Sequence, residues 1–207
     1  MTQRLEVHPE NPQQRLLLQA VSLLNNEGVV VFLTDSGYTL GCSVGSKDGV
    51  EAIRRIRQLD KTHLFTVLCR DLSEMSVYAR VSNAHFRLIK AHTPGPYTFI
   101  LTATKSVPKR LQHPNRKTIG IRVTDHPAAM GLLDALGAPL LTVSLFSSGQ
   151  GELEEEALYE ELECLDRSVD VLLDSGPALL SPTTVVDLTE ERPIVLRYGV
   201  GDADSFE

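Results

Sequence analysis

A short run of apolar residues followed at once by a polar turn is the feature that most constrains how this chain can fold. The run is Val29-Val30-Val31-Phe32-Leu33 and the turn is Thr34-Asp35-Ser36-Gly37. A continuous apolar, mostly β-branched run suits a strand that is buried on both faces. In an open α/β sheet, ligands bind just past the carboxyl ends of the strands. Hydroxyl and carboxylate groups at this point therefore indicate either a ligand site or an ordinary polar turn after a core strand.

Length and composition bound the class of protein. A chain of 207 residues with 42% hydrophobic and 23% charged residues fits one globular domain, which we place at residues 1–207. No apolar run approaches the roughly 20 residues of a membrane-spanning helix, and the N-terminus has no signal-peptide core. The three cysteines, Cys42, Cys69 and Cys164, lie far apart and predict no disulfide framework. We therefore expect a cytoplasmic protein.

Strand and helix patterns alternate along most of the chain. Apolar or alternating runs predict strands at 29–33, 40–44, 64–69, 97–101, 118–123, 140–144, 170–173, 183–188 and 194–197. Residues 152–166 hold seven Glu and one Asp with leucines at helical spacing, which predicts an acidic amphipathic helix. Alternation of this kind predicts an α/β protein with a mixed sheet.

The net charge of −7 conceals a basic middle. Between Ile53 and Arg122 there are 14 Lys and Arg against three acids, a charge of +11, whereas the rest of the chain has six basic and 24 acidic residues, a charge of −18. A basic stretch in an acidic protein indicates a site for phosphates or for nucleic acid. The alternative is that these charges are scattered over several solvated faces.

Two arginines near the end of a predicted helix are candidates for binding anions. The helix begins at Ser46 or Asp48, is predicted to end near Leu59, and carries Arg55 and Arg57 in its last turns. Cations at that end complement the helix dipole. A guanidinium group also binds phosphate oxygens with two hydrogen bonds, so both interpretations stay open.

The predicted strand 118–123 offers a second candidate surface. Its two-residue period places Thr118, Gly120 and Arg122 on one side. A hydroxyl, a bare backbone and a cation on one face indicate either the wall of a ligand site or the solvated face of an edge strand.

Polar residues also gather at or just beyond the ends of predicted strands, at Thr34, Thr142, Ser144, Thr183 and Arg197. Together with Arg55, Arg57 and Arg122, they are typical of a site that holds a phosphorylated ligand beside a small polar one. The common nucleotide-binding loops G-x-x-x-x-G-K-[ST] and G-x-G-x-x-G are absent from the sequence. No spacing predicts a zinc site or a Ser-His-Asp triad.

Short motifs occur along nearly the whole chain in the order of a known family. Residues 34–41 resemble the family motif P-T-D-T-V-Y-G-L-G, and residues 55–57 fall at the family's K-x-R. Residues 94–101, 120–122 and 126–127 match P-G-P-x-T-x-I-L, G-x-R and H-P. Residues 138–144 with 148–149, 182–188 and 196–197 match A-P-L-x-x-x-S-A-N-x-S-G, P-S-T-V-V-D-L and I-L-R. On these residues the chain resembles the YrdC/YciO family, the threonylcarbamoyl-AMP synthases. The resemblance is greatest to the YciO branch.

The resemblance implies both a fold and a reaction. The fold would be YrdC-like, a twisted open mixed sheet with flanking helices around a large positively charged cavity. The reaction would be that of a nucleotidyltransferase that joins threonine, bicarbonate and ATP, with Mg²⁺, into threonylcarbamoyl-AMP and pyrophosphate. That product feeds the threonylcarbamoyladenosine modification of tRNA.

The resemblance also assigns roles to residues. Threonine would be held by Thr34, Arg122, Thr142 and Thr183. ATP would be held by Arg55, Arg57, Thr118, Ser144 and Arg197. Arg55 and Arg57 would be the catalytic cations, because a carbamate carboxylate must approach an anionic α-phosphate. No residue is assigned to a metal, and Mg²⁺ would arrive with the nucleotide.

Several positions differ from the family pattern. Leu33 stands in place of Pro, Arg55 in place of Lys, Cys69 in place of a frequent His, Phe146 in place of Asn and Tyr198 in place of Pro. Two other functions therefore stay open. One is binding of double-stranded RNA or tRNA, which rests on the basic middle and on the family's association with RNA. The other is a diverged nucleotide-binding enzyme with a different acceptor.

Overall fold

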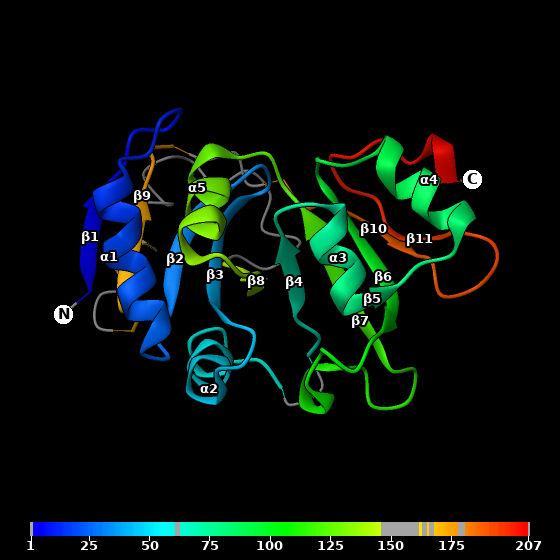
Figure 1. The fold of residues 1–207 in the computed structure, drawn as a ribbon, viewed down its shortest axis with the longest axis horizontal. Coiled ribbons are helices and arrows are strands. Elements are labelled where there is room, and N and C mark those ends of the chain that lie inside the picture. The colour runs from blue at the N-terminus through cyan, green and yellow to red at the C-terminus, as the bar shows by residue number, and fades with distance from the viewer. Residues whose placement is uncertain are drawn as a thin grey trace.

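The centre of the protein is one mixed open sheet that holds every strand of the described chain (Figure 1). The computed structural model describes residues 2–60, 63–145, 162, 165, 168–177 and 181–206. Within them the eleven strands are β1 (Gln3–Glu6), β2 (Val30–Thr34), β3 (Gly37–Ser43), β4 (Thr66–Cys69), β5 (Ala79–Arg80), β6 (Tyr97–Ala103), β7 (Thr118–Val123), β8 (Leu140–Ser144), β9 (Val171–Asp174), β10 (Thr184–Asp187) and β11 (Ile194–Arg197). The predicted α/β class with a mixed sheet is confirmed.

Five α-helices are described alongside the sheet. They are α1 (Gln14–Asn25), α2 (Lys47–Ile56), α3 (Leu72–Tyr78), α4 (Asn83–Ala91) and α5 (Pro127–Leu136), with short 3-10 helices η1 (Lys109–Leu111) and η2 (Asp204–Phe206). In Figure 1, α1, α5, α3 and α4 lie in front of the sheet, and α2 lies at its lower edge. Helices therefore flank the sheet, as the resemblance implies.

The strand order mixes distant parts of the sequence. The order is β1-β9-β2-β3-β8-β4-β7-β6-β10-β11, and β5 pairs with β6. Strand β2 is antiparallel to β3, and β4 is parallel to β7. Strand β7 lies between β4 and β6 and is buried along its whole length, so it is not an edge strand. The interpretation of Thr118, Gly120 and Arg122 as a solvated edge is therefore wrong.

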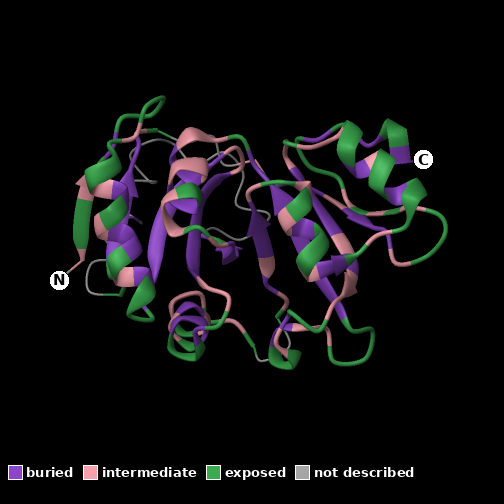
Figure 2. Cartoon of the chain, in the orientation of Figure 1, coloured by how far each residue is buried: buried purple, intermediate pink, exposed green. Residues whose placement is uncertain are grey.

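Two clusters of buried apolar side chains hold the layers together. One joins α1 and α5 to β2 and β9, through residues such as Leu17, Ala129 and Phe32. The other contains Ile53 of α2 and Ile121 of β7. Figure 2 shows the strands largely buried and the outer faces of the helices exposed. The continuous burial of β2 follows from its unbroken apolar run.

Most element boundaries follow the predicted ones. Strands 118–123, 140–144 and 194–197 are confirmed to the residue. Strand β3 begins three residues before the predicted start, because Gly37 adopts a φ of 104° and pairs with Thr34 in a tight hairpin. Helix α2 ends at Ile56 rather than near Leu59. The predicted acidic helix lies outside the described residues, apart from positions 162 and 165.

The described cysteines are not paired with each other. Cys42 and Cys69 are buried free thiols, whereas Cys164 lies outside the described residues. No helix within those residues is long and apolar enough to cross a membrane.

Two adjacent leucines of α1 provide a matched test of the α1–α5 packing. Leu17 is 2% exposed, whereas Leu18 is 50% exposed. We expect Leu17→Ala to lower the free energy of unfolding by about 3 kcal/mol, because it leaves a cavity beside α5. Leu18→Ala should change it by less than about 0.5 kcal/mol. Urea unfolding of both variants checks this, and equal losses would contradict the packing described here.

Candidate functional site

The site is built on the hairpin between β2 and β3. The Thr34 hydroxyl donates to the Gly37 carbonyl at 2.9 Å, and the Ser36 backbone N–H donates back to Thr34 Oγ1 at 3.3 Å. These bonds close the turn on itself. As a result, Asp35 and Ser36 are presented beyond the end of β2 on a backbone that is held locally.

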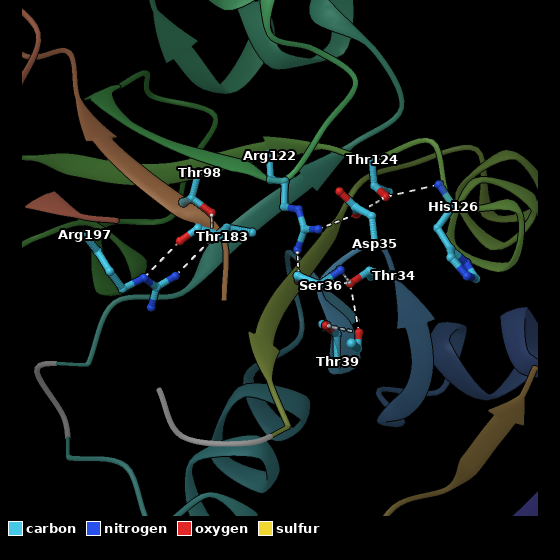
Figure 3. A network of polar contacts seen from close by, with 11 residues as sticks. Thr34, Asp35, Ser36, Thr39, Thr98, Arg122, Thr124, His126, Thr183 and Arg197 are labelled. Atoms are coloured by element: carbon cyan, nitrogen blue, oxygen red, sulfur yellow. Dashed lines mark hydrogen bonds and ion pairs between the residues drawn. The ribbon is translucent and has the colours of Figure 1, made fainter. Parts of the chain in front are cut away.

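A buried arginine meets this turn. The Arg122 side chain, on β7, is 7% exposed and forms an ion pair with Asp35 through Nη2. Its Nη1 donates to Ser36 Oγ at 2.6 Å. Three strands separate β2 from β7 in the sheet, so the contact requires the sheet to twist and curl between them. Figure 3 shows Arg122 directed at Asp35 and Ser36.

The ion pair is made through one oxygen of the carboxylate. Asp35 Oδ1 accepts from Arg122 and also from the Thr124 hydroxyl. Asp35 Oδ2 and Arg122 Nε are both buried and have no hydrogen-bond partner among the described residues. The pair therefore retains an unused acceptor and an unused donor.

The pKa of Arg122 depends on burial and on three charged neighbours, of which Asp125 acts least and raises it. Burial lowers the pKa of the Arg122 guanidinium, and the charge and hydrogen bond of Asp35 oppose that effect. The positive charge of Arg197 lowers the pKa of Arg122 further, which means that the two guanidinium groups lie close enough to interact. Two neighbouring cations, of which only Arg122 is paired with a described carboxylate, favour an additional anion.

Arg197 is held against the residue before β10. Its Nε donates to the Thr183 carbonyl and its Nη2 to Thr183 Oγ1, both at 3.0 Å. Thr183 Oγ1 in turn lies 2.9 Å from Thr98 Oγ1 on β6. Burial lowers the pKa of Arg197 as well. Figure 3 shows this group beside Arg122, so the structure brings four predicted residues together: Thr34, Arg122, Thr183 and Arg197.

The face of β7 that carries Arg122 is crowded near Gly120. A Cβ atom on Gly120 would lie 3.0 Å from Thr66 Oγ1 and 3.4 Å from Thr98 Cγ2. Thr142 belongs to the same region, because its hydroxyl donates to the Thr66 carbonyl at 3.0 Å. The bare backbone at Gly120 is therefore needed for packing between neighbouring strands.

The remaining predicted residues are Arg55, Arg57, Thr118 and Ser144. Arg57 Nε donates to the Ser144 backbone carbonyl at 2.9 Å, which joins the end of α2 to the end of β8. Arg55 is exposed on α2, and Thr118 is buried at the opposite end of β7 from Arg122. No described hydrogen bond links these residues to Arg122.

Three residues near Arg122 have no role in the sequence prediction, namely Asp35 as its ion-pair partner, Thr98 and Thr124. His126 lies next to them, and its backbone N–H donates to Thr124 Oγ1 at 3.2 Å. Burial lowers the pKa of His126, and the charge of Asp35 opposes that effect. The signal that could have revealed Asp35 is its place between Thr34 and Ser36, since a buried arginine needs a carboxylate nearby.

Many of the other basic residues have separate structural partners. Arg70 pairs with Glu74, and Arg116 pairs with Asp187. Arg110 donates to the carbonyls of Gly45 and Ser46. Some of the cations between residues 53 and 122 therefore make separate local contacts. This agrees with the alternative that these charges are scattered and do not all converge on one anion site.

Comparison with known proteins establishes the family. The family model for Sua5, YciO and YrdC proteins, which is described as "Telomere recombination", matches residues 22–199. The chain therefore belongs to the Sua5/YciO/YrdC family. This confirms the resemblance found in the sequence motifs.

Individual relatives refine the comparison. The chain is 50% identical to protein YciO of Escherichia coli over the full length of both, and the crystal structure of that protein superposes with a TM-score of 0.93. It is 31% identical to the threonylcarbamoyl-AMP synthase of Chromobacterium violaceum, over 70% of this chain and 76% of that one. P. abyssi Sua5 in complex with L-threonine shares the fold, with a TM-score of 0.85 and 23% identity over 96% of this chain and 58% of that one.

Replacing Asp35 tests the dependence of the site on the buried ion pair. We expect Asp35→Asn to lower the free energy of unfolding by about 3 kcal/mol, because it leaves the Arg122 charge buried without its counter-ion. It should also lower the pKa of His126, since the charge of Asp35 raises it. Urea unfolding and an NMR titration of His126 measure the two effects.

The exposed neighbour Asp125 supplies the control for stability. Asp125→Asn should change the free energy of unfolding by less than about 0.5 kcal/mol. If the Asp35 variant were as stable as the Asp125 variant, the buried ion pair would not be the contact on which the site depends.

Proposed function

We propose that this chain is a threonylcarbamoyl-AMP synthase-like nucleotidyltransferase. It would join threonine, bicarbonate and ATP, with Mg²⁺, and release pyrophosphate, and its product would feed the threonylcarbamoyladenosine modification of tRNA. The proposal is supported by family membership and by the relative from C. violaceum that is named for this activity. The main structural support is the buried Arg122, which lies near a second cation, Arg197. Among the described residues, Asp35 forms the ion pair with Arg122.

The threonine end of the proposed site is the group around Arg122. A carboxylate suits this place, because a guanidinium binds carboxylate oxygens with directed hydrogen bonds. Thr34, Thr142 and Thr183 supply hydroxyl groups that can orient a small polar molecule. All three side chains are buried and already ordered, so ligand binding costs little of their conformational entropy.

The ATP end of the proposed site consists of Arg55, Arg57, Thr118, Ser144 and Arg197. In the reaction, a carbamate oxygen forms a bond to the α-phosphorus while the bond from that phosphorus to the pyrophosphate oxygen breaks. Both reactants are anions, so fixed cations lower the barrier by offsetting their repulsion. Mg²⁺ would be carried by the phosphate oxygens of ATP, in keeping with its preference for few protein ligands.

Two differences from the family pattern bear on the acceptor. Cys69, where the family often has His, is a buried thiol whose pKa is raised by burial, so it stays neutral. Phe146, where the family has Asn, lies outside the described residues. A diverged enzyme that keeps the nucleotide but uses another acceptor is therefore the nearest alternative within this proposal.

Product analysis with an arginine variant tests the proposed reaction. With ATP, Mg²⁺, bicarbonate and threonine, we expect the wild-type protein to form threonylcarbamoyl-AMP, detected by mass spectrometry. Arg55→Ala should reduce the rate about 100-fold, because it removes a cation that stabilises the transition state. Arg15→Ala, at an exposed position on α1, should leave the rate unchanged. Pyrophosphate release that does not depend on threonine would contradict the assigned acceptor.

Binding of double-stranded RNA or tRNA is the second candidate function. It is favoured by exposed cations on α2 and on the neighbouring segment around η1, which Arg110 joins to the start of α2. These cations are Lys47, Arg55, Lys105, Lys109, Arg110 and Lys117. A cluster of this kind can contact phosphates along a nucleic-acid backbone.

Salt-dependent titration tests this second candidate. If the cluster binds RNA, the affinity for duplex RNA should fall steeply with salt concentration. The double variant Lys105→Ala, Lys109→Ala should lower the slope of log K against log salt by about 2. Lys90→Ala on α4 is the matched control. Equal slopes for all three proteins would exclude this surface as the RNA site.

A further inference from the structure

The hydrogen bonds around Asp35 have directions that can be assigned without ambiguity. The His126 backbone N–H can only donate, so Thr124 Oγ1 accepts from it at 3.2 Å. The Thr124 hydroxyl proton is then free to donate to Asp35 Oδ1. Thr124 is 1% exposed, so its hydroxyl is confined to these two partners among the described residues.

Two donors therefore meet on one oxygen of Asp35. Oδ1 accepts from both Thr124 and Arg122, whereas Oδ2 has no described partner. On the guanidinium, Nη2 is used by Asp35 and Nη1 by Ser36, whereas Nε has no described partner. Both unused atoms are buried, which makes this arrangement costly unless another contact requires it.

The two unused atoms are the two halves of one missing hydrogen bond. In a guanidinium group, Nε and Nη2 point in the same direction and together match both oxygens of a carboxylate. With Nη2 on Oδ1, the second bond of such a pair would run from Nε to Oδ2. The ion pair between Arg122 and Asp35 is thus held with one bond where its chemistry permits two.

We propose that Thr124 is a positioning residue that keeps Asp35 in this one-bond arrangement. By binding Oδ1 from the side of α5, Thr124 holds the carboxylate turned away from Arg122 Nε. Asp35 then neutralises the buried charge without occupying the whole edge of the guanidinium. The guanidinium therefore keeps a donor, Nε, that Asp35 does not use, and Arg122 can form a hydrogen bond to the carboxylate of a ligand.

The substrate class follows from this arrangement and rests on the function proposed above. A ligand with a carboxylate gains from an arginine that is only partly satisfied, whereas an analogue with a hydroxymethyl group in place of the carboxylate does not. Thr124 would therefore act on affinity for threonine but not for threoninol, the corresponding alcohol.

Substitution of Thr124 by Val and by Ser tests the proposal. Valine has nearly the shape of threonine but lacks the hydroxyl, so Asp35 should turn and form the second bond to Arg122. We expect the affinity for threonine, measured by calorimetry, to fall about tenfold in Thr124→Val, the loss of one charge-assisted hydrogen bond. Thr124→Ser should restore it, and the affinity for threoninol should change little. Thr102→Val, at a threonine on β6 whose hydroxyl makes no described hydrogen bond, is the control for the loss of a threonine hydroxyl.

A crystal structure of the Thr124→Val protein gives a readout that does not depend on the proposed function. Asp35 Oδ2 within hydrogen-bonding distance of Arg122 Nε supports the proposal, whereas an unchanged one-bond pair overturns it. Equal losses of threonine and threoninol affinity would also overturn it, since they would indicate a purely structural role. If the wild-type protein binds no threonine, the proposed function fails, and the crystal structure alone decides the role of Thr124.

Discussion

A buried positive charge on β7 is the constraint around which the rest of the site is arranged. Arg122 is almost fully enclosed, and an enclosed guanidinium without a carboxylate would cost several kcal/mol. Asp35 supplies that carboxylate from a turn three strands away. The closed β2–β3 hairpin and the curl of the sheet are both conditions for this one contact.

The ion pair also explains why the neighbouring polar groups are buried. Ser36 and Thr124 each make a hydrogen bond to one member of the pair, and Arg197 is held against Thr183 close to it. Buried polar groups of this kind are stable only when their hydrogen bonds are made. Arg122 Nε and Asp35 Oδ2 are the exceptions, because neither has a described hydrogen-bond partner. The site therefore keeps one donor and one acceptor that a fully satisfied core would use.

Much of the fold could be predicted from the sequence because its strands are apolar and short. Strands 118–123 and 140–144 have runs that suit no other element, and both are confirmed to the residue. The start of β3 could not be predicted, since it depends on a positive φ at Gly37 rather than on apolar pattern. The central position of β7 also could not, because strand order is set by contacts between distant segments.

The candidate site was predictable in part, because several of its residues belong to short sequence motifs. Motifs identified Arg122, Thr183 and Arg197, and the structure brings them together. Their partners were hidden, because the hydrogen bonds that Thr124 donates and Asp35 accepts depend on three-dimensional proximity and leave no periodic pattern. The motifs also place Arg57 at the nucleotide, and this assignment stays a prediction. The contact of its Nε with the Ser144 carbonyl could not be predicted, because a backbone acceptor leaves no side-chain motif.

The most direct measurement is a crystal structure of the wild-type protein grown with L-threonine, Mg²⁺ and a non-hydrolysable ATP analogue. We expect the threonine carboxylate on Arg122, with Asp35 still bonded through one oxygen, and the phosphates of the analogue near Arg197 and Arg55. Threonine bound elsewhere, or an Arg122 that contacts only Asp35 and Ser36 while threonine is bound, would contradict it.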